Sequence, residues 1–333
     1  MTDTWTWATV TQASPLRIKV DGDTSALDAT TDDLVGSLAV DDRVRVHLHS
    51  DGIIVTGIQG GGNRSNPNLI INSNFMVNQR GAASGASVAH NAYLLDRWKN
   101  VSGGGRTFSW SDTGGVRTFT LVSDVTYGTQ MDQPVEARNL PAGTYTISCP
   151  NTAVVLSATT SAATLTSGAG GVQTFTTDGT LDVNIGVYEP AGSTQALTWI
   201  KLERGAVATP YQPPTYDDDL RACVRYYWRM KATTTSSYSR LALGFAISAT
   251  RVVAQVPLHV PMRVAVPTVI PSGSLGLYDG VSGVHALTAL AQGESGSAAI
   301  ELLCDSTSLT QYRPHTLLTA GDSNAFIAFD AEL

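Results

Sequence analysis

The chain has 333 residues, which is enough for two to three folding units of ordinary size. Charged residues make up only 15% of it and glycine occurs 31 times, a composition that favours short strands and turns and predicts an all-β protein. The net charge of -7 gives no general attraction to nucleic-acid phosphates or anionic membranes, so we expect no nucleic acid partner and no membrane insertion.

The N-terminal stretch MTDTWTWATVTQ has no basic region followed by an apolar run, so we expect no secretory signal and synthesis in a cytoplasm. Three cysteines, Cys149, Cys223 and Cys304, lie far apart and form no CxxC pair. This spacing argues against a disulfide framework and a cysteine zinc site, and it predicts three buried thiols.

Residues 1–60 are predicted to form a small barrel of short strands. The stretches WTWATVTQ, LRIKVDGD, RVRVHLH and IIVTGI alternate apolar and polar residues, and Asp-Gly pairs at 21–22 and 51–52 favour tight turns. Residues 61–67 follow as a flexible, glycine-rich linker, which we place as the clearest domain boundary.

Residues 68–214 are predicted to form a β-sandwich or jelly roll of about eight strands. The strand signals are regularly separated by Gly, Asn, Asp and Pro turns, and they run from NLIINSNFMVNQRG through YLLDRW, RTFSW, RTFTLV, GTYTIS, QTFTT and LDVNIGVY to LTWIKLE. Three prolines between 210 and 214 then exclude further helix or central strand.

Residues 215–231 are predicted to form a short amphipathic linker helix. One apolar stripe has helical spacing and consists of Leu220, Cys223, Val224, Tyr227 and Trp228. Thr215, followed three residues later by Asp218, resembles a capping box. We expect Leu220, Val224, Tyr227 and Trp228 to form a joint, packed against the next module or against copies of the chain around a three-fold axis.

Residues 232–333 return to short apolar strands and predict a C-terminal β-sandwich. Its strand signals are RLALGFAIS, VVAQVPLHV, PTVIPSG, LGLYD, AAIELLCD and AFIAFDAEL.

No motif for catalysis occurs in the sequence. It has no phosphate loop, GxGxxG, HExxH, EF-hand loop or GxSxG elbow. GDSN at 321–324 resembles the opening motif of one esterase family, but no histidine follows it. We therefore predict no catalytic residue, no metal ligand and no cofactor, and keep a hydrolase as the alternative.

Binding is the favoured chemistry, because β-sandwich modules hold sugars on an exposed aromatic ring flanked by polar side chains. In the central segment the candidate carbohydrate-binding residues are Trp110, Tyr127 and Tyr188, whereas we expect Trp98 to be buried. The competing interpretation is a core position, above all for Trp110, which shares a strand face with Phe108.

Two stretches resemble a family of bacteriophage minor tail and tail-fibre proteins, in which a carbohydrate-binding-module-like jelly roll opens and closes with conserved-looking strand motifs. The opening motif is matched by Asn68, Leu69, Ile70, Asn72, Phe75, Gln79, Arg80, Gly81, Asp96, Arg97 and Trp98. The closing motif and the helix after it are matched by Lys201, Leu202, Glu203, Gly205, Ala208, Thr209, Tyr211, Leu220, Cys223, Arg225, Tyr226 and Tyr227.

VPMRVAVPTV and AFIAFDAEL also resemble strands of the distal domain in such proteins. Residues 1–60 are more loosely similar to small OB-like barrels at the start of minor tail proteins of phages that infect actinobacteria.

The resemblance implies a virion tail component, made in the host cytoplasm and commonly a homotrimer. Its N-terminal domain would attach to other tail proteins, and its β-sandwiches would bind host cell-wall glycan without catalysis. Such modules often hold a structural calcium ion, although no motif supports one here. A virion-associated glycan hydrolase or esterase, and a purely structural tail protein, stay open as alternatives.

Overall fold

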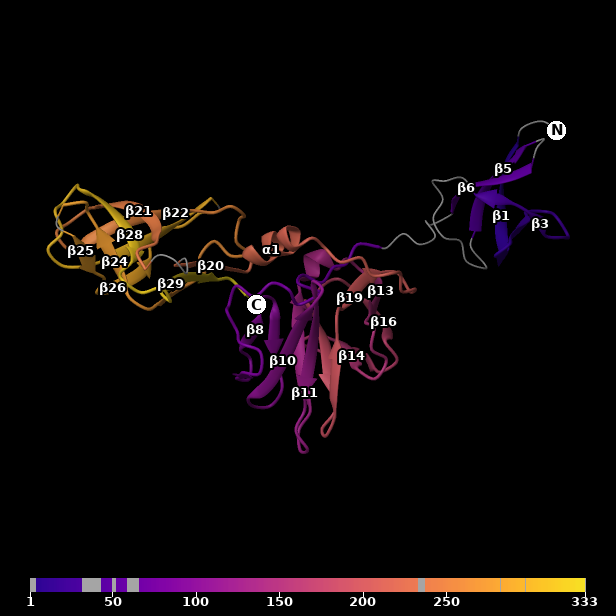
Figure 1. The fold of residues 1–333 in the computed structure, drawn as a ribbon, viewed down its shortest axis with the longest axis horizontal. Coiled ribbons are helices and arrows are strands. Elements are labelled where there is room, and N and C mark those ends of the chain that lie inside the picture. The colour runs from indigo at the N-terminus through magenta and orange to yellow at the C-terminus, as the bar shows by residue number, and fades with distance from the viewer. Residues whose placement is uncertain are drawn as a thin grey trace. The chain divides into compact units, whose positions relative to one another are not determined.

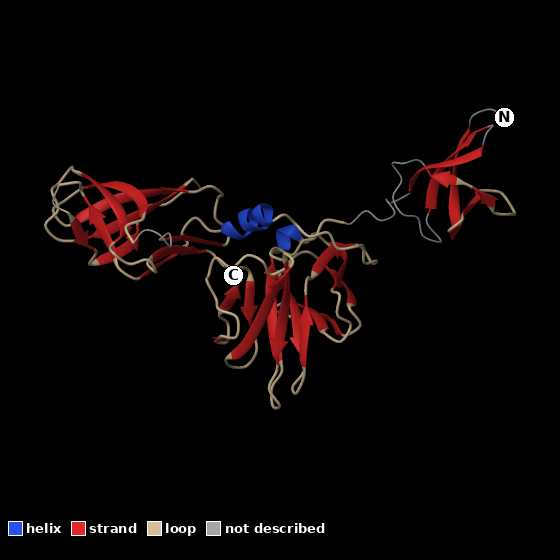
Figure 2. Ribbon diagram, viewed as in Figure 1, coloured by secondary structure: helices blue, strands red, loops and turns tan. Residues whose placement is uncertain are grey.

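The computed structural model describes residues 4–31, 43–49, 52–58, 66–232, 237–281, 283–296 and 298–332. The protein is mostly β, with 49% strand and 4% helix, and several antiparallel sheets include two curled half-barrels, which confirms the all-β prediction (Figure 2). The chain separates into two compact units, one of residues 1–67 with 207–212 and one of residues 68–206 with 213–333. Of the predicted linker 61–67, residues 61–65 lie outside the described part.

The first unit contains one six-stranded sheet in the order β3-β2-β1-β5-β6-β4, several strands of which are labelled in Figure 1. Its strands are β1 (Thr4–Ala13), β2 (Leu16–Val20), β3 (Leu27–Asp28), β4 (Thr30–Thr31), β5 (Arg43–His49) and β6 (Gly52–Ile58). The predicted alternation buries one side of each long strand, and the core is formed by Ala8, Val10, Ile18, Val20, Val44, Val46 and Val55.

The second unit holds two hydrophobic cores. Three sheets surround the first, in the orders β18-β11-β10-β7, β15-β14-β17-β12-β9-β8 and β16-β13-β19. The strands are β7 (Ser87–Val88), β8 (Tyr93–Leu95), β9 (Trp98–Asn100), β10 (Arg106–Thr113), β11 (Val116–Val122), β12 (Thr129–Val135), β13 (Gly143–Ser148), β14 (Val155–Thr159), β15 (Thr164–Gly168), β16 (Val172–Thr177), β17 (Val183–Glu189), β18 (Thr194–Leu197) and β19 (Lys201–Arg204), with a 3-10 turn η1 (Ala137–Asn139). Trp98 is fully buried in this core, as predicted.

The second core lies among the C-terminal strands, which form a three-stranded sheet β20-β29-β23 and a seven-stranded sheet β25-β24-β28-β21-β22-β27-β26. These strands are β20 (Tyr227–Lys231), β21 (Arg240–Ala246), β22 (Arg251–Pro257), β23 (Thr268–Ser272), β24 (Leu275–Tyr278), β25 (Val284–Ala286), β26 (Ala289–Gln292), β27 (Ala299–Asp305), β28 (Pro314–Thr319) and β29 (Phe326–Asp330). All three cysteines are buried free thiols, which confirms that prediction.

The predicted helix 215–231 is wrong in its second half. Helix α1 covers Tyr216–Val224 only, and Tyr227–Lys231 is strand β20. Pairing with β29 accounts for this, because β20 and β29 are antiparallel partners from Tyr227 opposite Asp330 to Lys231 opposite Phe326. Aromatic side chains also fit a pleated sheet well, so tertiary pairing overrides the apparent helical spacing.

The predicted start of α1 is confirmed. Thr215 is its N-cap, and the hydroxyl accepts a hydrogen bond from the Asp218 amide. Three aspartates in the first turn complement the positive end of the helix dipole. Among the described residues, no helix is long and apolar enough to cross a membrane.

Candidate functional site

The loop between β11 and β12 holds the most exposed of the predicted carbohydrate-binding rings. The Asp124 carboxylate accepts hydrogen bonds from the amides of Thr126, at 2.8 Å, and Tyr127, at 2.6 Å. These two bonds stabilise the charged carboxylate and lower the pKa of Asp124. The loop is thereby shaped so that the Tyr127 side chain, 60% exposed, stands out from the sheet.

Arg106 supports the Tyr127 ring from the start of β10. Its Nε donates to the Gly128 carbonyl at 3.1 Å and one terminal nitrogen donates to the Gly103 carbonyl at 3.2 Å. The guanidinium carbon lies 5.3 Å from the centre of the Tyr127 ring, and the guanidinium is 3.9 Å from the Asp124 carboxylate. The backbone bonds fix this cation in place, which leaves the ring and the carboxylate preorganised beside it.

Tyr188 reaches the same loop from β17. A β-carbon at Gly128 would lie 2.5 Å from Cε2 of Tyr188 and 2.6 Å from its hydroxyl. Only glycine therefore leaves room for the Tyr188 side chain against the backbone at this position. The half-buried Tyr188 therefore lies against the backbone next to Tyr127. The structure brings these two predicted residues together.

Trp110 lies apart from this pair and is packed against the core. It is four residues beyond Arg106 on β10, about 13 Å along the strand. Its ring stacks on Phe119 with the ring centres 6.0 Å apart and an angle of 8° between the planes, and the Arg117 guanidinium lies 5.4 Å from its centre. These surroundings agree with the competing interpretation of Trp110 as a core residue.

The group formed by Tyr127, Tyr188, Arg106 and Asp124, called here the Tyr127 site, has the parts that a shallow sugar site needs. An exposed ring can stack on the apolar face of a sugar, while the arginine donates to hydroxyls and the carboxylate accepts from them. Its four side chains come from β10, β17 and the β11–β12 loop, so the sheets around the first core hold them in place.

Comparison with known protein-family models finds no match, and comparison with curated proteins finds none either. Function is therefore argued from the residues of this chain.

The predicted joint residues occupy two different surroundings. Tyr227 is buried, with the Arg80 guanidinium 3.9 Å from its ring centre and its carbonyl accepting from Gln79 at 2.8 Å. Trp228 instead packs on Phe329 of the second core, with ring centres 5.6 Å apart. Since neighbouring residues of a strand face opposite ways, β20 contacts residues beside the first core on one side and packs into the second core on the other.

Leu220 and Val224 are only half-buried. The buried side of α1 is formed by Asp219 and Cys223. Asp219 accepts a hydrogen bond from the backbone amide of Asn72 at 2.8 Å, which attaches the helix to the segment that precedes β7. This polar contact is with the preceding part of the chain, whereas the apolar stripe was predicted to pack against the next module or against copies of the chain.

A buried ionic network at this joint escaped prediction, and we call it the joint network. It consists of Arg80, Arg97, Glu136, Tyr226, Asp330 and Glu332. Arg97 lies over the Tyr226 ring at 3.6 Å, and the Tyr226 hydroxyl donates to Glu136 at 2.6 Å. The arginines of QRG and DRW were the only visible signal, and their partners lie too far along the chain to be paired by spacing.

Burial raises the pKa of two carboxyl groups near the joint network. The pKa of Asp96 rises to about 6, mainly because the group is desolvated. The pKa of Asp219 also rises to about 6 for the same reason, with a smaller contribution from Asp218. Both groups therefore keep their protons to a higher pH than an exposed aspartate does.

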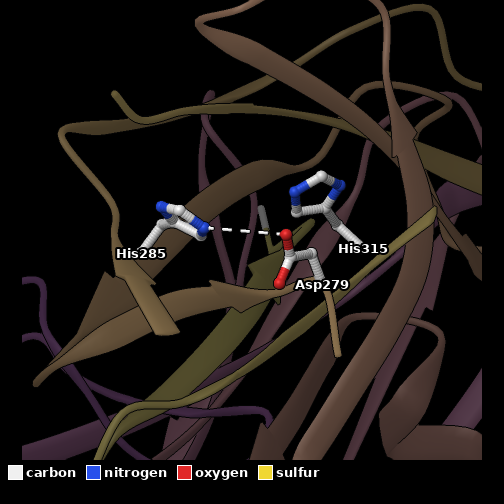
Figure 3. Close-up of side chains that lie close together, drawn as sticks. All are labelled: Asp279, His285 and His315. Carbon is white, nitrogen blue, oxygen red and sulfur yellow. Dashed lines mark ion pairs between the residues drawn. The ribbon is translucent and has the colours of Figure 1, made fainter. Parts of the chain in front are cut away.

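Only one group of side chains among the described residues could hold a metal ion: Asp279, His285 and His315 (Figure 3). They come from the end of β24, from β25 and from β28. Their spacing along the chain forms no short motif, so no sequence pattern groups them.

Proposed function

We propose that this chain is a non-catalytic bacteriophage tail component that binds host cell-surface glycan through the Tyr127 site. The observation that carries the proposal is the exposed Tyr127 ring, which lies beside the Arg106 guanidinium and whose backbone amide is bound by Asp124. The resemblance of residues 66–333 to minor tail and tail-fibre proteins supports the same conclusion. In this proposal the first unit is an OB-like barrel that attaches to other tail proteins, and the central part of the second is a jelly roll.

A homotrimer is part of the proposal. Leu243, Phe245 and Ile247 alternate along and just beyond β21 and are 72%, 55% and 42% exposed. Such a run on one side of a strand is typical of a contact between proteins, and we assign it to a second copy of the chain. A trimer would raise the effective affinity of a weak sugar site through multivalency.

The experiment mixes the full-length protein with isolated bacterial cell walls and measures both retention and turnover. We expect retention without release of reducing ends or acyl groups. Reducing ends or acyl groups released in proportion to protein would instead identify a glycan hydrolase or an esterase. Absence of retention on every wall tested would favour a purely structural tail protein.

Replacing Arg106 by Met sharpens this experiment, because Met keeps much of the length of the side chain but removes the cation and its donors. We expect weaker retention and a lower melting temperature, because the Gly103 and Gly128 carbonyls lose their donor, so retention is compared at a temperature where both proteins are folded. Equal retention of wild type and Arg106→Met would show that Arg106 does not contribute to binding at the Tyr127 site.

A further inference from the structure

We propose that Asp279, His285 and His315 bind a divalent transition-metal ion, with Zn²⁺ as the best-matched occupant. The inference is independent of glycan binding. It rests on three side chains whose ligand atoms all lie within 4.8 Å of one another (Figure 3).

The sheet topology explains why these side chains meet. β24 pairs with β25, where Leu277 is opposite His285, and with β28, where Tyr278 is opposite Thr316. Continuing the second register by one residue places Asp279 opposite His315. Three neighbouring strands therefore present one ligand each at the same end of the sheet.

Each of the two histidines has a buried ring nitrogen that receives no hydrogen bond from the protein. The Nε2 atoms of His285 and His315 are buried without a hydrogen-bond partner. A buried polar atom without a hydrogen-bond partner costs folding free energy, because it has lost its contacts with water. A bound ion or a bound water is the usual explanation for such an atom. Two such atoms beside one carboxylate favour an ion.

The protonation of His315 suits a ligand. Its Nδ1 lies 3.0 Å from the Arg313 carbonyl, which can only accept, so Nδ1 carries the proton. Nε2 then presents a lone pair toward the cluster. A backbone acceptor behind a ligating histidine is the arrangement that fixes the tautomer in metal sites.

The Asp279 carboxylate is also held in position. Its Oδ1 accepts from the Val281 amide at 2.9 Å, and its Oδ2 lies 4.0 Å from His285 Nε2. Zinc ligands at about 2.1 Å from a tetrahedral ion are roughly 3.4 Å apart, so the cluster needs to contract by about 1 Å. Small rotations of the imidazole rings supply such a movement.

Two imidazoles and one carboxylate select the class of ion. Imidazole nitrogen suits zinc and neighbouring transition metals, whereas Ca²⁺ and Mg²⁺ require oxygen ligands. Three protein ligands leave at least one coordination position for water or an external group. The ion would fasten β24, β25 and β28 together.

Arg313 provides an internal competitor. Its guanidinium donates to Asp279 Oδ2 at 3.0 Å, and its side chain is partly exposed, so it can withdraw when a dication arrives. While it stays, it neutralises the carboxylate and opposes metal binding. Removing it should therefore strengthen binding, which a purely structural role of the ion pair does not predict.

The test uses the full chain after treatment with a chelator, titrated with ZnCl₂ and separately with CoCl₂. We expect one metal per chain, a rise in melting temperature, and the visible absorption of protein-bound Co²⁺ with nitrogen ligands. His285→Asn should weaken Zn²⁺ binding at least tenfold, and Arg313→Met should tighten it. His90→Asn, which removes a histidine outside the cluster, should leave it unchanged.

No saturable binding of Zn²⁺ or Co²⁺ overturns the proposal, as does binding that His285→Asn leaves intact. Equal stabilisation by CaCl₂ would overturn the imidazole assignment. Weaker Zn²⁺ binding in Arg313→Met would overturn the competitor role and with it the proposed geometry.

Discussion

The Arg97 guanidinium donates a hydrogen bond to the Glu332 carboxylate across 235 residues of sequence, and both side chains are almost completely buried, at 2% and 3% exposure. Arg80 donates to the same carboxylate at 3.3 Å. Two arginines beside the first core thus hold the segment that follows β29. This contact joins the C-terminal segment to residues beside the first core.

Glu332→Ala should therefore destabilise the second unit strongly. Removing one partner of a buried ion pair leaves the other charge unsatisfied and costs about 3–5 kcal/mol of unfolding free energy. Asp305→Ala is the matched control, because its pair with Arg251 is exposed and contributes under about 1 kcal/mol. Urea denaturation measures both, and equal losses would contradict the role given to the joint network.

Tyr227→Asp should separate the two cores of the second unit. The change removes the ring under Arg80 and buries a carboxylate opposite Asp330, at a cost of at least about 3 kcal/mol. Val224→Asp should cost less, since Val224 is half-buried. Tyr216→Asp, at an exposed position of α1, is the control. Limited proteolysis of the segment between the two cores and thermal melting measure the effect. Unchanged proteolysis and melting in Tyr227→Asp would contradict the role of Tyr227 in joining the cores.

Stability should depend on pH through Asp219. Its folded pKa of about 6 exceeds its unfolded value, so its favourable contribution is present in full below the unfolded pKa and is lost as pH rises through about 6. Asp219→Asn removes this titration. When the pH is lowered from 7.5 to 5, the melting temperature of wild type should rise relative to that of Asp219→Asn. Each kcal/mol of added unfolding free energy corresponds to roughly 2–4 °C. A constant difference between the two proteins would show that Asp219 is not desolvated.

The stripe Leu243, Phe245 and Ile247 should control the oligomeric state. Phe245→Asp places a charge in the proposed contact between copies and should convert a trimer to monomers, as measured by sedimentation or light scattering. Val281→Asp, another exposed apolar position among the C-terminal strands, should have no effect. A trimer that survives Phe245→Asp would exclude this stripe as the interface.

Local patterns predicted much of this fold. Alternation located the strands, and the Thr215 cap marked the start of α1, because both signals arise from neighbours in sequence. The strand at Tyr227–Lys231 was missed because β29, nearly a hundred residues later, provides its pairing. The joint network and the group of Asp279, His285 and His315 were missed for the same reason.

The Tyr127 site was predicted only in part. The expectation that β-sandwich modules hold sugars on aromatic rings pointed to Tyr127 and Tyr188, but only the fold shows that Tyr188 lies against Gly128, next to Tyr127. Arg106 and Asp124 were not singled out, since arginine and aspartate at strand ends are ordinary surface residues. Only the fold shows that Arg106 lies beside the Tyr127 ring and that Asp124 binds the Tyr127 backbone amide.

The most direct test of the central claim is the affinity of full-length Tyr127→Ala for a panel of purified bacterial cell-wall polysaccharides, compared with wild type and with Tyr312→Ala. Tyr312 is an even more exposed tyrosine among the C-terminal strands, at 78% against 60% for Tyr127, and is the control. We predict that wild type and Tyr312→Ala bind the same polysaccharide, and that Tyr127→Ala binds it at least about tenfold more weakly. Equal binding by all three proteins would contradict the Tyr127 site, and binding by none would contradict glycan recognition itself.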